Sequence, residues 1–245
     1  FTLFSEEMFY YWFIKVLEVE SHLNTIMHFL ILKEIELYIL NLFIRKLIRM
    51  KEILFIRHGL LEGKFVDYTM LNFDDIEALL VKSVCPNIDA TITKKKLRNV
   101  VFLKNYEVVI SSTQNRSIQT ANIIAQLYLK SPLLKTDLLN EVHFFKGIIA
   151  KKDVLGGMDN IRLTVLTNWY EGLHCEKFTD SVLRFRLLMK FLKSLPQKKI
   201  ICVTHGWYMR IISLYQLKSN LNKVSLNDLL SVKPAKNFDL IKLRI

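Results

Sequence analysis

Three short segments of the chain are apolar at consecutive positions, at residues 53–56, 108–110 and 200–203. Strands buried on both faces of a parallel sheet have this pattern, because neither of their faces meets water. Between these runs, apolar residues recur at the three- and four-residue spacing of helices. The pattern therefore predicts an α/β fold, a three-layer sandwich in which a mostly parallel central sheet carries helices on both faces.

The helical spacing predicts five helices, and their ends are marked by proline or by polar residues. They are expected at residues 73–83, 93–104, 114–129, 178–194 and 207–217, and a final edge strand is expected within residues 237–245. Ser111, Ser112 and Thr113 are candidate N-caps for the third helix. Residues 146–176 should form a cap in which Trp169 and Tyr170 either line a pocket or, as is commoner for buried aromatics, anchor the cap on the core.

Basic residues stand where the predicted strands end. Arg57 and His58 follow the first run, Arg116 lies in the first turn of the helix after the second, and His205 follows the third. Open α/β sheets bind ligands at the carboxyl ends of their strands, and a helix N-terminus also favours an anion. Guanidinium groups bind phosphate oxygens through two parallel hydrogen bonds. The sequence therefore predicts a phosphate site at this edge.

The order of these motifs resembles the histidine phosphatase (phosphoglycerate mutase-like) superfamily, in its small phosphatase branch. The resemblance covers roughly residues 50–245 and rests on motifs that occur in one order along the chain: Arg57-His58-Gly59, Ser111 to Arg116 with Gln119-Thr120-Ala121, and Thr204-His205-Gly206. The tripeptide Arg-His-Gly alone is a weak signal, whereas three motifs in order, each after a predicted strand, are a strong one.

The resemblance implies a role for each of five residues. His58 would attack phosphorus through Nε2 while a backbone carbonyl holds its Nδ1–H. Arg57 and Arg116 would bind the phosphate, and His205 would complete the ring of catalytic donors. Glu141 would give a proton to the leaving alkoxide and then activate the water that hydrolyses the phosphohistidine.

Two positions depart from the family pattern. Many members carry an asparagine as a phosphate ligand where this chain has Lys64, which would either contact the phosphate as a point charge or face solvent. Glu141 stands in a stretched local pattern, with no glycine close behind it. His143, two residues later, is expected to be a partly exposed loop residue.

The predicted function is that of a metal-independent phosphomonoester hydrolase acting on a small anionic phosphate ester. Four fixed donors would do the work of a metal, and the chain shows no cluster with metal-ligand spacing, so neither metal nor cofactor is expected. Two alternatives stay open. One is a mutase that returns the phosphoryl group to a second hydroxyl, although the short segment at residues 146–176 argues against it. The other is a non-catalytic phosphate-binding or scaffold protein.

Composition narrows the class of partner. The chain has 245 residues, a hydrophobic fraction of 51% that can supply the core of one domain, and a formal net charge of +12. A basic balance favours anionic ligands. The lysines are scattered, and the one dense run, at residues 94–98, has no interleaved aromatic residues, so no nucleic-acid partner is expected. A small-molecule phosphate ester is the expected partner, bound by a monomer or a homodimer.

The domain is expected to span residues 50–245, and residues 1–49 form a leader of uncertain status. Either Met50 is the natural start and the leader is not translated, or Leu37 to Lys51 form a basic amphipathic helix at a membrane surface. The leader has no uncharged run of the roughly 18 residues that a membrane span needs, so no stable membrane insertion is expected. Three cysteines without CxxC spacing indicate a reducing compartment, and a cytoplasmic protein is expected.

Overall fold

The computed structural model describes residues 11, 32–42, 50–62, 72–81, 87–129 and 133–245. The chain divides into two compact units, Phe1–Met50 and Lys51–Ile245. In the first unit, residues 32–42 form a helix. Whether residues 1–49 belong to the mature protein stays a prediction. No helix in the described ranges combines the length and the apolar character needed to cross a membrane.

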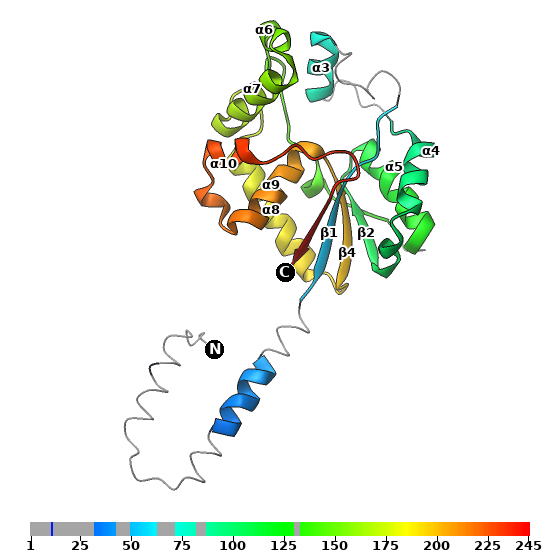
Figure 1. The fold of residues 1–245 in the computed structure, drawn as a ribbon, viewed down its shortest axis with the longest axis vertical. Coiled ribbons are helices and arrows are strands. Elements are labelled where there is room, and N and C mark those ends of the chain that lie inside the picture. The colour runs from blue at the N-terminus through cyan, green and yellow to red at the C-terminus, as the bar shows by residue number, and fades with distance from the viewer. Residues whose placement is uncertain (1–10, 12–31, 43–49, 63–71, 82–86, 130–132) are drawn as a thin grey trace. The chain divides into compact units, whose positions relative to one another are not determined.

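The second unit is built on a five-stranded sheet (Figure 1). Its strand order is β3 (Leu133–Lys135), β2 (Val108–Ser111), β4 (Lys199–Thr204), β1 (Glu52–Arg57) and β5 (Leu240–Arg244). The first four strands run parallel to their neighbours, and β5 pairs with β1 in the antiparallel direction. The mostly parallel sheet and the final edge strand are both confirmed.

One face of the sheet is covered by the later helices. Ile53 and Phe55 of β1 pack in one cluster with residues of α8 (Phe178–Ser194) and α9 (Gly206–Lys218), and the same cluster continues beyond the sheet into α7 (Gly157–Glu171). The apolar stripe of α8 is buried along its whole length, as its helical spacing predicts.

The other face is covered by earlier helices. Leu54 and Ile56, which alternate with the residues of the first face, pack against α4 (Ala90–Arg98) and α5 (Asn115–Ile124). Successive side chains of a strand point to opposite faces, so the unbroken apolar run of β1 supplies both clusters. The three-layer sandwich is confirmed.

Several helix boundaries differ from the predicted ones. The helix predicted at residues 93–104 begins earlier, at Ala90, because the side chain of Asp89 caps it by accepting from the Ile92 backbone N–H at 2.8 Å. It ends at Arg98 and is followed by a 3₁₀ helix, Val101–Asn105. The remaining elements are α3 (Phe73–Leu80), a π-helical turn (Ala125–Leu129), a 3₁₀ turn (Asp137–Leu139), α6 (Lys151–Leu155), another 3₁₀ turn (Leu221–Lys223) and α10 (Leu226–Ser231).

The cap consists of α6 and α7, which stand with α3 beyond the carboxyl ends of the strands (Figure 1). Trp169 of α7 is fully buried, donates from its indole N–H to Ser181 Oγ at 3.2 Å, and packs edge-on against Phe178. The hydroxyl of Tyr170 donates to the Val224 carbonyl at 3.3 Å. Both aromatic residues therefore anchor the cap on the core, the commoner of the two predicted roles.

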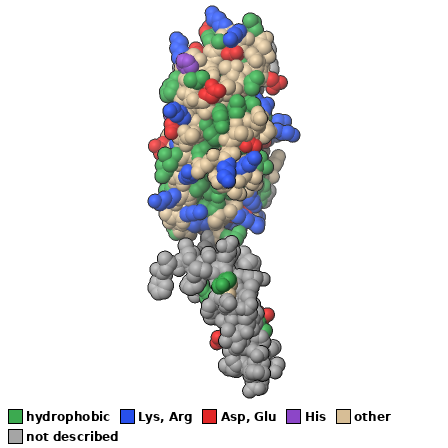
Figure 2. Space-filling model, turned by 90° about the vertical axis from the view of Figure 1, so that its left-hand side faces the viewer, with side chains coloured by type: hydrophobic (Ala, Val, Ile, Leu, Met, Phe, Trp, Pro, Cys, Tyr) green, Lys and Arg blue, Asp and Glu red, His purple; other side chains and the backbone are tan. Residues whose placement is uncertain are grey.

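Lys and Arg side chains are spread over the surface. On the face that Figure 2 shows, they are interspersed with Asp and Glu side chains instead of gathering in one patch. The dense basic run falls on the exposed side of α4, where Lys94, Lys95 and Lys96 face solvent and Leu97 faces the core. The expectation that nucleic acid is not a partner stays a prediction.

Candidate active site

His58 lies at the carboxyl end of β1 and is almost completely buried. Its Nδ1 donates to the Gly59 carbonyl at 2.9 Å, which leaves Nε2 as the unprotonated ring nitrogen. Gly59 in turn donates its backbone N–H to Thr120 Oγ1 at 2.9 Å. A Cβ atom at Gly59 would lie 2.3 Å from Thr93 Oγ1, so only glycine fits this turn.

The surroundings of His58 favour its neutral form. Burial lowers its pKa well below the ordinary value of 6.5, and the positive charges of Arg116 and then Arg57 lower it further. At neutral pH the imidazole is therefore uncharged, and Nε2 carries a lone pair.

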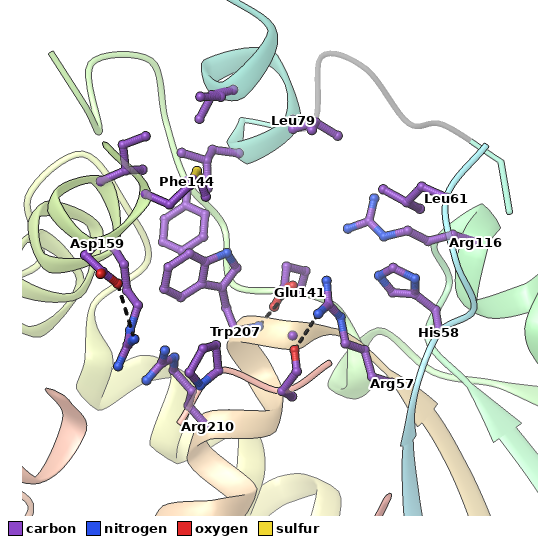
Figure 3. Close-up of a pocket in the computed structure, with 18 residues that line it drawn as sticks. Arg57, His58, Leu61, Leu79, Arg116, Glu141, Phe144, Asp159, Trp207 and Arg210 are labelled. Atoms are coloured by element: carbon purple, nitrogen blue, oxygen red, sulfur yellow. Dashed lines mark hydrogen bonds and ion pairs between the residues drawn. The ribbon is translucent and has the colours of Figure 1, made fainter. Parts of the chain in front are cut away.

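Arg57 is the last residue of β1, and its guanidinium group lies beside Gly206 at the start of α9. Its Nη1 donates to the Ala235 carbonyl, a contact drawn in Figure 3. A Cβ atom at Gly206 would lie 3.1 Å from both Cζ and Nε of Arg57. The glycine after His205 thus makes room for the guanidinium group of Arg57.

Arg116 and His205 are joined directly. Arg116 lies in the first turn of α5 and donates from Nε to Nδ1 of His205 at 3.1 Å. Because Nδ1 accepts, the neutral ring of His205 carries its proton on Nε2, which lies 2.6 Å from Ser112 Oγ and 3.0 Å from Ser117 Oγ. The ring centroids of His58 and His205 are 5.2 Å apart.

The carboxyl group of Glu141 lies at the N-terminus of α9. Its Oε1 accepts from the backbone N–H of Tyr208 at 2.8 Å and of Val142 at 3.2 Å, and its Oε2 accepts from that of Trp207 at 3.2 Å. A helix N-terminus has unpaired N–H groups and a partial positive charge, so it is a suitable place for a carboxylate.

The loop that carries Glu141 is held on both sides by α8 and the residues before it. Arg184 donates from Nη1 to the Asn140 carbonyl at 2.6 Å and forms a largely buried ion pair with Glu176 at 3.0 Å. Glu176 accepts from the backbone N–H of His143 at 3.2 Å. The ion pair therefore fixes the backbone one residue before and two residues after Glu141.

These residues surround a cavity of about 340 Å³ (Figure 3). Arg57, His58 and Arg116 line one end of it, and Glu141 lies nearby. His205 is fully buried and is not among the lining residues. The structure thus brings four of the predicted site residues to the cavity, and it places a fifth, His205, against Arg116 outside the lining. Lys64 lies outside the described residues.

The described residues contain no group of three or more His, Cys, Asp and Glu side chains that could hold a metal ion. The donors at the charged end of the cavity are guanidinium and imidazole groups. Such groups bind phosphate oxygens through charge-assisted hydrogen bonds.

A family model of the histidine phosphatase superfamily (branch 1) matches residues 93–232, more than half of the chain. The chain belongs to this superfamily. The match extends from α4 to the residues just after α10 and includes Arg116, Glu141 and His205. The family assignment made from the three motifs is confirmed.

Solved structures share the histidine phosphatase fold with this chain. A structure described as mycobacterial hydrolase 2 has a TM-score of 0.59 and 16% identity, covering 80% of this chain and 82% of its own. The mycobacterial glucosyl-3-phosphoglycerate phosphatase has a TM-score of 0.57 and 16% identity, with 80% and 90% covered. An Entamoeba histolytica phosphoserine phosphatase, solved with 3-phosphoglyceric acid, has a TM-score of 0.51 and 15% identity, with 78% and 89% covered. The comparison with curated proteins found no match.

Sequence reasoning missed the residues that support this histidine phosphatase site. Ser112 and Ser117 contact His205, and the predicted capping role of Ser111 to Thr113 is wrong, because α5 has Gln114 as its N-cap and no side-chain cap bond. Ser117 could have been identified as a site residue from the sequence, because it follows Arg116 directly and precedes the apolar stripe of α5. His143 is exposed, as expected of a loop residue.

Proposed function

We propose that this histidine phosphatase superfamily member is a metal-independent phosphomonoester hydrolase that acts through a phosphohistidine at His58. The observation that carries the proposal is the state of His58, a neutral ring whose Nδ1–H is bound by the Gly59 carbonyl and whose Nε2 stands beside Arg57 and Arg116. The names of the similar solved structures include phosphatases for small phosphate monoesters, which also supports this proposal.

In the first step, the Nε2 lone pair of His58 attacks phosphorus as the bond from phosphorus to the ester oxygen breaks. Arg57 and Arg116 neutralise the charge on the equatorial oxygens, where the loose transition state of phosphoryl transfer concentrates it. The carboxyl group of Glu141, in its protonated form, gives its proton to the leaving oxygen, so the alcohol departs uncharged.

In the second step, water attacks the phosphohistidine. The carboxylate of Glu141 takes a proton from the water as the new phosphorus–oxygen bond forms and the phosphorus–nitrogen bond breaks. Inorganic phosphate leaves, and His58 regains its neutral ring. His205 takes part in both steps by holding Arg116 in place.

One observation favours the alternative of phosphate binding without turnover. Both carboxyl oxygens of Glu141 already accept backbone N–H groups of α9, so the side chain has a structural partner at this helix N-terminus whether or not it takes part in catalysis. A chain of this kind would bind phosphate at Arg57 and Arg116 and release it unchanged.

Turnover of an aryl phosphate separates these two functions. The hydrolase should release the aryl alcohol in a burst equal to the concentration of active sites, and rapid quenching should trap acid-labile, base-stable phosphate on the protein. His58→Ala should abolish both signals, and a chelator should leave the rate unchanged. Absence of turnover together with binding of inorganic phosphate would support the alternative, and full activity of His58→Ala would contradict the mechanism.

A further inference from the structure

The wall of the cavity opposite His58 is apolar. In Figure 3 the rings of Phe144 and Trp207 face His58 and Arg116 across the open space, and Leu79 stands above it. Most of the described residues that line the cavity from α3, α7 and the loops beside them are apolar: Leu61, Ile76, Leu79, Leu80, Phe144, Met158 and Ile161. The exceptions are Asp159 and Arg162 of α7.

Ring contacts and a backbone bridge hold this wall in place. The ring of Phe144 packs edge-on against that of Trp207, with centroids 5.6 Å apart. Trp207 also contacts Arg210, whose guanidinium carbon lies 5.5 Å from the centroid of the indole ring. Phe144 is buried, and its segment pairs with Cys175 through an isolated bridge. The aromatic surface is therefore formed before any ligand arrives.

The other charged residues that line the cavity, Asp159, Arg162 and Arg210, all contact protein groups, although Nη2 of Arg210 is buried without a hydrogen-bond partner in the described part of the chain. Arg162 pairs with Asp159 at 3.9 Å and donates to the Leu230 carbonyl at 3.4 Å. Arg210 donates to the Val232 carbonyl at 2.6 Å, so both guanidinium groups support the segment at the end of α10. Burial, and then the charge of Arg162, lower the pKa of Arg210 to about 10, so it keeps its proton at neutral pH.

We propose that the cavity wall formed by Leu79, Phe144, Met158 and Trp207 is the subsite for an apolar leaving group, so that the substrate is a phosphate monoester of an alkyl or aryl alcohol instead of a sugar. This inference rests on the proposed hydrolase, because the leaving group is defined by the attack of His58. It specifies the substrate class, which the catalytic residues alone do not determine.

The apolar wall should favour an alkyl or aryl leaving group over a sugar, because the two differ in the interactions with water that they lose in this cavity. A polyhydroxylated sugar placed against this wall gives up water at the hydroxyls that face its carbon atoms without gaining a partner there, and unsatisfied polar groups are costly to bury. An alkyl or aryl group gains from every carbon that it removes from water. The catalytic end binds the phosphate in either case, so the wall decides between the two.

A homologous series of alkylphosphonates, from ethyl to hexyl, tests the subsite by calorimetry without requiring turnover. The phosphonate group occupies the phosphate end in each compound, and only the buried chain grows. The dissociation constant should fall by about three- to fourfold for each added methylene until the cavity is filled. A polyol phosphonate of the same length as the hexyl compound should bind no better than ethylphosphonate.

Variants connect the effect to the wall. Met158→Gln and Leu79→Gln conserve the approximate size of partly exposed side chains, and together they should reduce the gain to less than about twofold for each methylene. Leu163→Gln is the matched control, because Leu163 is on the same helix as Met158, is 48% exposed where Met158 is 42%, and does not line the cavity. It should keep the full gain.

The outcomes separate this inference from the proposed hydrolase. Equal affinity along the alkyl series, or tighter binding of the polyol compound, would overturn the apolar subsite even if an aryl phosphate is hydrolysed. If the affinity of both wall variants still rose by the full three- to fourfold for each added methylene, the assignment of the subsite to Leu79 and Met158 would be overturned. A steep alkyl series in a protein that hydrolyses no phosphate ester would support the subsite and contradict the hydrolase.

Discussion

Arg116 donates from Nε to Nδ1 of His205 at 3.1 Å, and the opposite nitrogen of the same ring lies against Ser112 and Ser117. Both nitrogens of His205 are thus engaged within the protein. The family resemblance implies that His205 donates to the phosphate itself, whereas this geometry supports a positioning role, in which His205 would orient the guanidinium group of Arg116.

Substitution of His205 tests this role. His205→Leu removes the acceptor for Arg116 and should lower kcat/KM for an aryl phosphate by about 10²-fold, the usual cost of losing one preorganised donor. His205→Gln offers an amide oxygen to Arg116 and should recover about a tenth or more of the activity. The measurement is steady-state kinetics on both variants.

A double-mutant cycle with Arg116→Lys supplies the control. If His205 acts only through Arg116, the two substitutions should be far from additive, because the second removes a group that the first has already misplaced. Additive losses would show that His205 contacts the phosphate directly.

The lowered pKa of His58 predicts a loss of stability in acid. In the unfolded chain the imidazole has a pKa near 6.5, whereas in the folded protein burial and two arginines hold its pKa well below that value. Below pH 6.5 the unfolded state therefore binds a proton that the folded state does not, and stability falls as the pH drops toward the folded pKa. The slope of this contribution is at most about 1.4 kcal/mol per pH unit.

Denaturant unfolding between pH 7.5 and pH 5 measures this effect. His58→Gln removes the titrating group, so its free energy of unfolding should fall less with decreasing pH than that of the unmodified protein. Parallel curves for the two proteins would mean that His58 titrates in the same way in the folded and unfolded states.

The ion pair between Arg184 and Glu176 should affect both stability and catalysis. Both side chains are largely buried, with 16% and 12% of their surfaces exposed. Breaking a buried pair from one side leaves an uncompensated charge, so Glu176→Gln should cost about 3 kcal/mol of unfolding free energy. Because the pair holds the loop around Glu141, the same variant should also lower kcat more than it raises KM.

A comparison with Asp159→Asn separates a local effect from general destabilisation. Asp159 pairs with Arg162 at 3.9 Å and its side chain is fully exposed, so its loss should leave unfolding unchanged within about 0.5 kcal/mol. An equally small effect of Glu176→Gln would show that the loop around Glu141 does not depend on the ion pair.

Gly206→Ala should disturb Arg57 without touching His58. The added methyl group would lie 3.1 Å from Cζ and Nε of Arg57, closer than an ordinary contact, so the guanidinium group must shift. Inhibition by inorganic phosphate should weaken by about tenfold, since one charge-assisted pair of hydrogen bonds is misaligned. Phosphate inhibition of Arg57→Lys provides the scale, and unchanged inhibition in Gly206→Ala would show that Arg57 moves without cost.

The arrangement of the sheet could be predicted because buried strands have a simple signature. The register places Arg57 beside Thr204 and Ser111 beside Val203, so the motifs after three separate runs must meet at one edge. The edge strand β3 was missed because its three residues, half-exposed or exposed, have neither an apolar run nor a clear alternation.

The internal contacts of the site could not be predicted in the same way. The proton position of His205 depends on Ser112, Ser117 and Arg116, which approach its ring only after α5 has packed against β4. Likewise, Glu176 lies just before α8 and Arg184 within it, so their ion pair joins residues close in sequence, whereas the bond that Arg184 donates to the Asn140 carbonyl depends on tertiary structure.

Glu141 carries a carboxyl group that is both a partner of the α9 N-terminus and the proposed acid. Glu141→Gln keeps the size of the side chain and an oxygen that accepts backbone N–H groups, and it removes the exchangeable proton. An alkyl alcohol needs that proton in order to leave, so hydrolysis of alkyl phosphates should slow by about 10²–10⁴-fold. An activated aryl oxide leaves unaided, so formation of the phosphohistidine from an aryl phosphate should slow much less.

Pre-steady-state kinetics isolates this first step from the later attack of water. In the variant, the burst of aryl alcohol should persist while the steady-state rate falls, because the carboxylate that activates water is also lost. A structural role alone would slow the burst on aryl and alkyl substrates equally, since the N-terminus of α9 would move in both cases. Selective loss on the alkyl substrate, with an intact aryl burst, would place the proton of Glu141 on the leaving oxygen opposite His58.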